Sequence, residues 1–192
     1  MKKLNEKGFT LIELLAVIII LGVLLLVAIP SMNNTILNAK KDSFITTAKQ
    51  FISYVRYEAI QDTYALPTLG NATVVSRGVV ELERGGKVSS FDGSWDDNYS
   101  YIVIYAAGSN ANKPDYQYYI VLQDSTNSGC NLTSELSMER KDILYKNFAD
   151  DSVTTEKISE LVPGTSTIKI GDATATVTQV VLADGTIVNP AA

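Results

Sequence analysis

An uninterrupted apolar run near the N-terminus constrains this chain more than any other feature. From Phe9 to Ile29, only Thr10 and Glu13 are strongly polar. As an α-helix rising about 1.5 Å per residue, the run would be roughly 31 Å long, which is the thickness of the hydrocarbon core of a bilayer. We therefore predict a membrane-spanning helix over residues 9–30.

The charges around this run predict its orientation. Three of the first eight residues are lysines, whereas the next lysines along the chain are Lys40 and Lys41. Positive charge stays on the cytoplasmic side, so residues 31–192 are expected to lie outside. A secretory signal peptide would have a shorter apolar core and a small-residue cleavage site, and the VAIPSMNN sequence after the run contains no Ala-x-Ala.

Glu13 is unusual because it places a carboxylate inside the apolar run. Such a group costs about 2.5–3.5 kcal/mol on insertion scales, so it points to a function and to a cationic partner. An α-amino group would lie at the same depth if the chain were cut between Gly8 and Phe9. The carboxylate of one copy could then pair with the Phe9 amine of a neighbour shifted by about 6 Å, which would set the register between helices.

The sequence KGFTLIEL, from Lys7 to Leu14, resembles the processing site of type IV prepilins and pseudopilins. These proteins have a class III leader that ends in glycine, followed by phenylalanine and by a glutamate five residues into the mature chain. The resemblance implies that residues 1–8 are a leader cleaved after Gly8. It also implies that a prepilin peptidase methylates the Phe9 amine and that Glu13 registers the subunit against its neighbour.

Gly22 and Pro30 extend the resemblance, since they occupy the positions of a helix-loosening glycine and a kinking proline in type IVa-like pilins. Physical arguments agree with this assignment. Pro30 has no N–H for the carbonyl of Leu26, so the helix should bend or loosen there. Gly22 lowers helix propensity by about 1 kcal/mol relative to alanine. A filament built on such helices could stretch at this segment.

The resemblance also implies a cellular role. The partners would be other pilin subunits, the prepilin peptidase, an assembly platform with its ATPase, and the membrane, with no nucleic acid bound directly. The subunit would reside in the inner or cytoplasmic membrane before assembly and in a surface filament afterwards, acting in adhesion and motility. The alternatives are a pseudopilin of a type II secretion or competence (DNA-uptake) system, a minor tip pilin, or a membrane-anchored binding module.

Beyond Pro30 the chain is predicted to stay helical and to become amphipathic over residues 31–65. Apolar residues recur at helical spacing and form one stripe. The stripe consists of Leu37, Phe44, Ala48, Phe51, Val55 and Ala59. The opposite, charged face is expected to hold Lys40, Lys41, Asp42, Lys49, Arg56 and Glu58. The helix should end near Asp62–Ala65, before Leu66-Pro67.

Residues 66–192 are predicted to form a β-rich globular domain. The strongest hairpin signal is Tyr99–Ala106 against Tyr116–Gln123. Further strands are expected at Thr73–Val75, Gly78–Leu82, Thr165–Ile170, Thr174–Leu182 and Thr186–Val188, and a helix at Ser137–Phe148. The fold class is therefore α+β, with an antiparallel sheet packed on the amphipathic helix, which is also the pilin-like architecture that the resemblance implies.

Composition excludes several classes of function. The chain has no histidine, which excludes Ser-His and Cys-His nucleophile pairs and His-ligated zinc. Its one cysteine, Cys130, permits no internal disulfide and is expected to be buried. The formal net charge of −5 argues against a general nucleic-acid binder. We expect no enzyme, no cofactor and no metal site. Many Gram-negative type IV pilins close a C-terminal loop with a disulfide, so this chain favours a Gram-positive or anaerobic source.

Two clusters allow a binding interpretation. Six of the ten tyrosines lie between Tyr99 and Tyr119, where they form either a carbohydrate-binding platform or, as their alternation favours, one face of a sheet. Asp92, Asp96 and Asp97 surround Trp95 and could coordinate Ca²⁺, but their spacing does not match an EF-hand loop and favours an acidic, solvated turn. The same interpretation applies to Asp150-Asp151.

Overall fold

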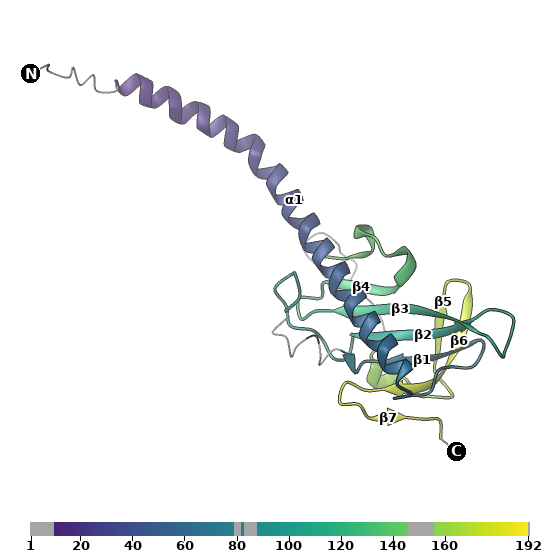
Figure 1. The fold of residues 1–192 in the computed structure, drawn as a ribbon. Coiled ribbons are helices and arrows are strands. Elements are labelled where there is room, and N and C mark those ends of the chain that lie inside the picture. The colour runs from purple at the N-terminus through teal and green to yellow at the C-terminus, as the bar shows by residue number, and fades with distance from the viewer. Residues whose placement is uncertain (1–9, 79–81, 83–87, 146–155, 192) are drawn as a thin grey trace, which may run out of the picture. The chain divides into compact units, whose positions relative to one another are not determined.

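The computed structural model describes residues 10–78, 82, 88–145 and 156–191. The chain divides into two compact units, Met1–Ala39 and Lys40–Ala192, which are treated in turn. Helix α1 (Leu11–Ile60) begins in the first unit and ends in the second. Figure 1 shows α1 followed by the strands in chain order.

In the first unit, α1 is made almost entirely of exposed apolar residues. The large apolar side chains from Leu11 to Ile29 are between 48% and 84% exposed. Within the described residues, α1 is the one helix that is long and apolar enough to cross a membrane. Exposure of so much apolar surface costs free energy in water, so this half of α1 requires lipid or other helices around it.

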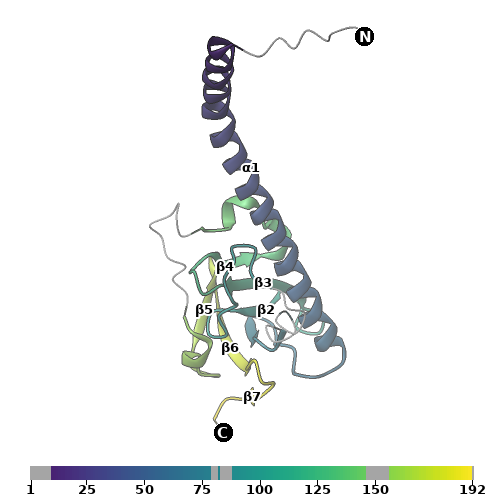
Figure 2. The ribbon, with the colours of Figure 1, turned by 90° about the vertical axis from the view of Figure 1, so that its left-hand side faces the viewer.

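In the second unit, the C-terminal half of α1 lies along one face of the sheet, as Figure 2 shows. The predicted stripe is confirmed there, because Phe44, Ala48, Phe51, Val55 and Ala59 are buried. The helix ends at Ile60, two residues before Asp62, whose φ of 52° is left-handed. The expected end of the helix is therefore correct to within the uncertainty of such boundaries.

The prediction that Glu58 lies on the charged, exposed face is wrong. Glu58 is only 7% exposed, and its Oε1 lies 3.2 Å from Nε of Arg77 and accepts a 3.0 Å hydrogen bond from the Tyr54 hydroxyl. A buried carboxylate needs such partners. Arg77 lies after the first strand and outside α1, so the spacing of residues within the helix could not predict its contact with Glu58.

The sheet has seven strands in the order β4-β3-β2-β1-β6-β5, with β7 paired to β6. The strands are β1 (Asn71–Val75), β2 (Tyr101–Ala107), β3 (Asp115–Gln123), β4 (Gly129–Ser134), β5 (Thr167–Ile170), β6 (Ala173–Val181) and β7 (Ile187–Val188). The predicted hairpin is confirmed as β2–β3, and the three predicted tail strands correspond to β5, β6 and β7. The α+β class is confirmed. The sheet is mixed, because β1 and β6 run parallel while the other pairs are antiparallel.

Two secondary-structure predictions are wrong. Gly78 and Leu82, the described residues of the expected strand Gly78–Leu82, are helical. A Cβ on Gly78 would lie 2.3 Å from the Phe51 ring, so the chain leaves the sheet to pass close over α1. The expected helix Ser137–Phe148 is replaced, over its described residues, by short 3₁₀ turns that follow β4; these are η1 (Glu135–Ser137) and η2 (Arg140–Asp142).

Strand alternation gives the sheet a core on each face. Ile102 and Ile104 of β2 are directed to the α1 side, whereas Tyr101 and Val103 belong to a cluster on the other side. That cluster is closed by residues from β5, β6 and the turn η3 (Ile158–Glu160), among them Ile158, Leu161 and Ile170. The globular unit is thus stabilised by two apolar cores, one on each face of the sheet.

Candidate assembly segment

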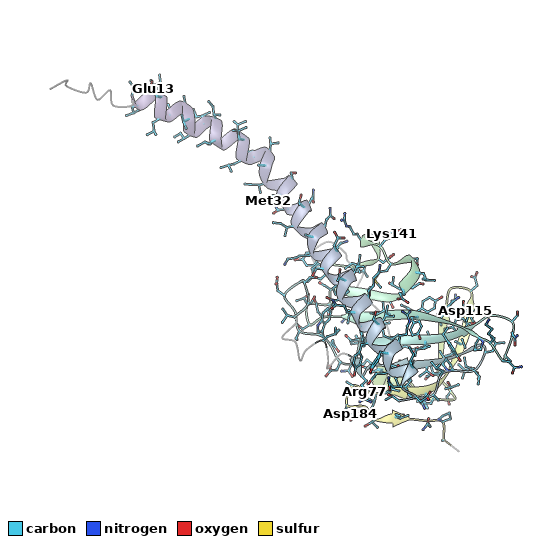
Figure 3. All side chains as sticks on the ribbon, in the orientation of Figure 1. Glu13, Met32, Arg77, Asp115, Lys141 and Asp184 are labelled. Atoms are coloured by element: carbon cyan, nitrogen blue, oxygen red, sulfur yellow. The ribbon has the colours of Figure 1, made fainter. Side chains whose placement is uncertain are left out.

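The predicted processing site precedes the first described residue. Gly8 and Phe9 lie outside the described part of the chain, so their roles remain predictions. The structure begins at Thr10, directly before α1. Glu13 lies in the first turn of α1, and Figure 3 marks it at the N-terminal end of the helix.

Thr10 and Glu13 form a reciprocal cap on the helix. The backbone N–H of Thr10 and its hydroxyl both donate to Oε2 of Glu13, each at 2.8 Å. In return, the backbone N–H of Glu13 donates to Oγ1 of Thr10 at 3.3 Å. This is a capping box, which satisfies backbone donors that have no partner within the helix. The two strongly polar residues of the apolar run therefore pair with each other.

The capping box leaves part of the Glu13 carboxylate open. The hydrogen bonds described for it all fall on Oε2, and no lysine or arginine among the residues in view lies within ion-pair distance. Leu11, Ile12 and Leu14 around it are exposed apolar residues. Glu13 is thus an oriented carboxylate on an apolar helix surface.

Gly22 and Pro30 both lie within α1, which is helical through each of them. A Cβ on Gly22 would have nothing within 4 Å. Shortly after Pro30, the hydroxyl of Thr35 donates to the carbonyl of Ser31 at 3.0 Å, a bond to the residue four positions earlier of the kind that often bends helices. The predicted roles of Gly22 and Pro30 in loosening the helix remain predictions, because they concern α1 in a filament that is stretched.

The aspartates near Trp95 lie in a turn that is held by a local hydrogen bond and by an ion pair to α1. Asp92 is paired with Lys40 at 2.8 Å, and Oδ1 of Asp96 accepts a bond from the backbone N–H of Asn98 at 2.9 Å. Trp95 is buried between them and packs edge-on against Phe44. Among the described residues, no group of three or more Asp, Glu, Cys or His side chains is placed to hold a metal ion. Asp150-Asp151 lies outside those residues.

The tyrosine cluster divides between the two faces of the sheet. Tyr101, Tyr105 and Tyr119 lie in or against the core on the side away from α1. Tyr116 and Tyr118 lie an odd number of residues before Tyr119 on β3. Because successive side chains of a strand point to opposite faces, these two tyrosines point to the α1 side. The expectation of one continuous tyrosine face is therefore wrong.

Cys130 is buried, as expected. Its burial raises the pKa of the thiol to about 12, far from the range of a reactive cysteine. Within the described structure its role is that of a small core side chain.

Two ionic contacts that no sequence pattern predicts join α1 to the segment after β4. Arg140 pairs with Asp42, and Arg56 pairs with Glu135. These residues are separated by 98 and 79 positions along the chain. The sequence shows that these four residues are charged, but no local pattern indicates which of them pair.

Comparison with known proteins identifies the N-terminal segment. Residues 3–29 match the family described as the prokaryotic N-terminal methylation motif. No curated protein and no solved structure matches the chain. The motif supports a class III prepilin leader and hence a type IV pilin or pseudopilin, whose members are structural subunits. It implies membrane anchoring, processing by a prepilin peptidase and assembly with other pilin subunits.

Proposed function

We propose that this chain, which begins with the prepilin methylation motif, is a structural subunit of a type IV pilus or pilin-like filament that serves surface adhesion and motility. It is not an enzyme in this proposal. The observation that carries it is the helix half Leu11–Ile29, whose large apolar side chains are exposed and whose one charged side chain, Glu13, is held in a helix cap. A surface of this kind is suited first to lipid and then to identical helices.

The apolar half of α1 can move from the membrane into a filament because it has no strong preference for lipid over identical helices. Lipid tails are as apolar as leucine, so helices associate in lipid through packing and polar contacts rather than through a hydrophobic driving force. Contacts with lipid can therefore be replaced by contacts with copies of the same helix at little hydrophobic cost. The β-rich domain predicted over residues 66–192 would remain outside the membrane and on the filament surface.

Cleavage between Gly8 and Phe9 would supply a cation for Glu13, which has no ion-pair partner among the residues that the structure describes. The new amine, which the peptidase would methylate, is one residue before Thr10. Oε2 of Glu13 is occupied by Thr10, while Oε1 is open to the Phe9 amine of a neighbouring subunit. Since Phe9 and Glu13 are four positions apart, this pair fixes a shift of about 6 Å between adjacent helices. Gly22 and Pro30 would let the helix loosen within the filament.

The proposed partners are other copies of the subunit, the prepilin peptidase, and an assembly platform with its ATPase. The proposed location is the cytoplasmic membrane and then the surface of a Gram-positive or anaerobic bacterium. A pseudopilin of a secretion or competence system is the second candidate, because the same motif match fits it equally. Long surface fibres distinguish a pilus from the short filaments of such machines.

Mass spectrometry of the N-terminal peptide, on protein from its native cells, tests the proposal. A peptide that begins at Phe9 with one added methyl group is expected. Accumulated protein that retains Met1–Gly8 would instead indicate a permanent anchor.

Variants at two glutamates then test assembly. Glu13→Ala is expected to be processed but not assembled, whereas Glu160→Ala, which changes an exposed glutamate of the globular unit, should assemble normally. Unimpaired assembly of Glu13→Ala would contradict the register argument.

A further inference from the structure

A small cavity opens on the α1 side of the sheet, beside the start of β3. Its volume is about 190 Å³. Four elements line it: α1 with Arg56, β3 with residues 115–118, β4 with Ser134, and the turn η1 with Glu135 and Leu136. Figure 3 marks Asp115 at the start of β3. All of these elements belong to the globular unit.

Two of the three charged side chains of the cavity, Arg56 and Glu135, form an ion pair, and Asp115 leaves the lining with a net negative charge. Nη2 of Arg56 lies 2.5 Å from Oε2 of Glu135, and the guanidinium carbon of Arg56 lies 4.5 Å from the centre of the Tyr118 ring. The ion pair and the ring fix the orientation of the guanidinium. Arg56 and Glu135 are both partly exposed, so their remaining N–H groups and carboxylate lone pairs can bind a ligand. Such a pair offers strong donors and acceptors without selecting a charged ligand.

Two tyrosines and a leucine supply the aromatic and apolar part of the lining, which Asp115, Gln117 and Ser134 complete. Tyr116 and Tyr118 are two residues apart on β3 and therefore share the face that carries the cavity. Leu136 follows Glu135 and is 90% exposed, the most exposed large apolar side chain of the described residues. The cavity thus combines two tyrosines and an exposed leucine with fixed polar groups.

From this combination we infer that the cavity binds a neutral sugar residue. A pyranose has C–H faces that pack on aromatic and apolar side chains, and hydroxyl groups that both donate and accept hydrogen bonds. The cavity is small and concave, which suits a single ring. The net negative charge of its lining favours a neutral hexose or N-acetylhexosamine over an acidic sugar. This inference goes beyond the filament role and does not depend on assembly.

Saturation-transfer NMR on the full-length protein in detergent micelles tests the inference. The probes are D-galactose, D-glucose and N-acetyl-D-glucosamine, with D-glucuronate and N-acetylneuraminate as acidic sugars. Signal transfer to at least one neutral sugar is expected, and titration should give a weaker or absent response for the acidic sugars. Absence of transfer to all three neutral sugars, or tighter binding of an acidic one, overturns the inference.

Variants locate the binding. Tyr116→Ala removes a ring of the cavity and is expected to weaken binding roughly tenfold, which corresponds to about 1.4 kcal/mol. Leu136→Ser changes a side chain that is already exposed, so it leaves the fold intact and should weaken binding as well. Tyr57→Ala is the matched control, because Tyr57 is 61% exposed on α1 and does not line the cavity.

Near-UV circular dichroism checks that each variant is folded. Sugar binding that survives both cavity variants overturns the inference. If those variants lose filament assembly while they keep sugar binding, the cavity is a contact between subunits. If the sugar results hold in a protein that never forms filaments, the proposed function fails and the sugar site stands.

Discussion

Arg140 binds both carboxylate oxygens of Asp42. Its Nε lies 2.6 Å from Oδ1 and its Nη2 lies 2.6 Å from Oδ2, so the planar guanidinium and the carboxylate form a two-bond pair. Next to it, Nζ of Lys41 donates to the carbonyl of Arg140 at 3.1 Å. These contacts join η2 to the part of α1 with which the globular unit begins.

Asp42→Asn is expected to lower the melting temperature at neutral pH and to lose this effect in acid. The guanidinium of Arg140 lowers the pKa of Asp42 below 3.8, its usual value. A carboxyl whose pKa is lower in the folded state stabilises the fold above its unfolded pKa, and loses this contribution as the pH falls through the folded pKa. The difference between wild type and Asp42→Asn should therefore shrink below about pH 4.

Thermal unfolding of the full-length protein in detergent, followed at neutral and acidic pH, measures this difference. The pair is exposed, so the effect is expected to be small. Ser43→Ala, a change at the neighbouring exposed position, is the control and should show no pH-dependent difference. A gap between wild type and Asp42→Asn that is the same at both pH values would contradict the assignment.

The elements that were predicted correctly are those with local signals. The β2–β3 hairpin has two β-rich runs joined by a loop with Gly108 and Pro114, and the tail strands are separated by turns at Gly171 and Gly185. The processing motif is contained in eight consecutive residues, so it too was visible in the sequence. Periodicity likewise predicted the buried stripe of α1.

What could not be predicted depends on contacts between distant parts of the chain. Strand β4 has a weak β composition and exists because β3 and Leu144 bind its two sides. The parallel pair β1/β6 joins segments about a hundred residues apart, with Val74 opposite Val180. Burial of Glu58 likewise follows from the distant Arg77. Tertiary contacts decide such elements, and local propensity does not.

Gly129→Ala is expected to destabilise the globular unit strongly. A Cβ at this position would lie 2.0 Å from the carbonyl oxygen of Leu122 and 2.9 Å from Cα of Gln123. Both are backbone atoms of the adjacent strand, so no side-chain movement relieves the clash. We expect a loss of about 3 kcal/mol, at the upper end of the usual range for overpacking.

Urea unfolding of the full-length protein in detergent gives this free energy. Thr165→Ala, at an exposed turn position, is the control and should change the free energy of unfolding by less than about 0.5 kcal/mol. Equal stability of the two variants would show that β3 and β4 are not paired at this register.

Cys130 is expected to resist alkylation in the folded protein. Only the thiolate reacts, and burial raises the pKa of this thiol to about 12, so both access and ionisation are suppressed. Iodoacetamide at mildly alkaline pH should label the protein in guanidinium and leave the native protein unlabelled, as read by intact mass. Thr165→Cys, which adds an exposed thiol, should be labelled once in the native state. Rapid native labelling at Cys130 itself would place the thiol at the surface.

Filaments of Pro30→Ala are expected to stretch less than wild-type filaments at the same force. Proline is about 3 kcal/mol less favourable than alanine in a helix interior, and its replacement restores an N–H for the carbonyl of Leu26. The stiffer helix should therefore resist extension between Gly22 and Pro30. Force–extension curves of single filaments measure this, with Ser31→Ala as a control that changes the next residue and keeps the same backbone donors. Since the helix is continuous through Pro30 in the unloaded subunit, a filament of Pro30→Ala that extends as far as wild type would locate the stretching elsewhere, in the contacts between subunits.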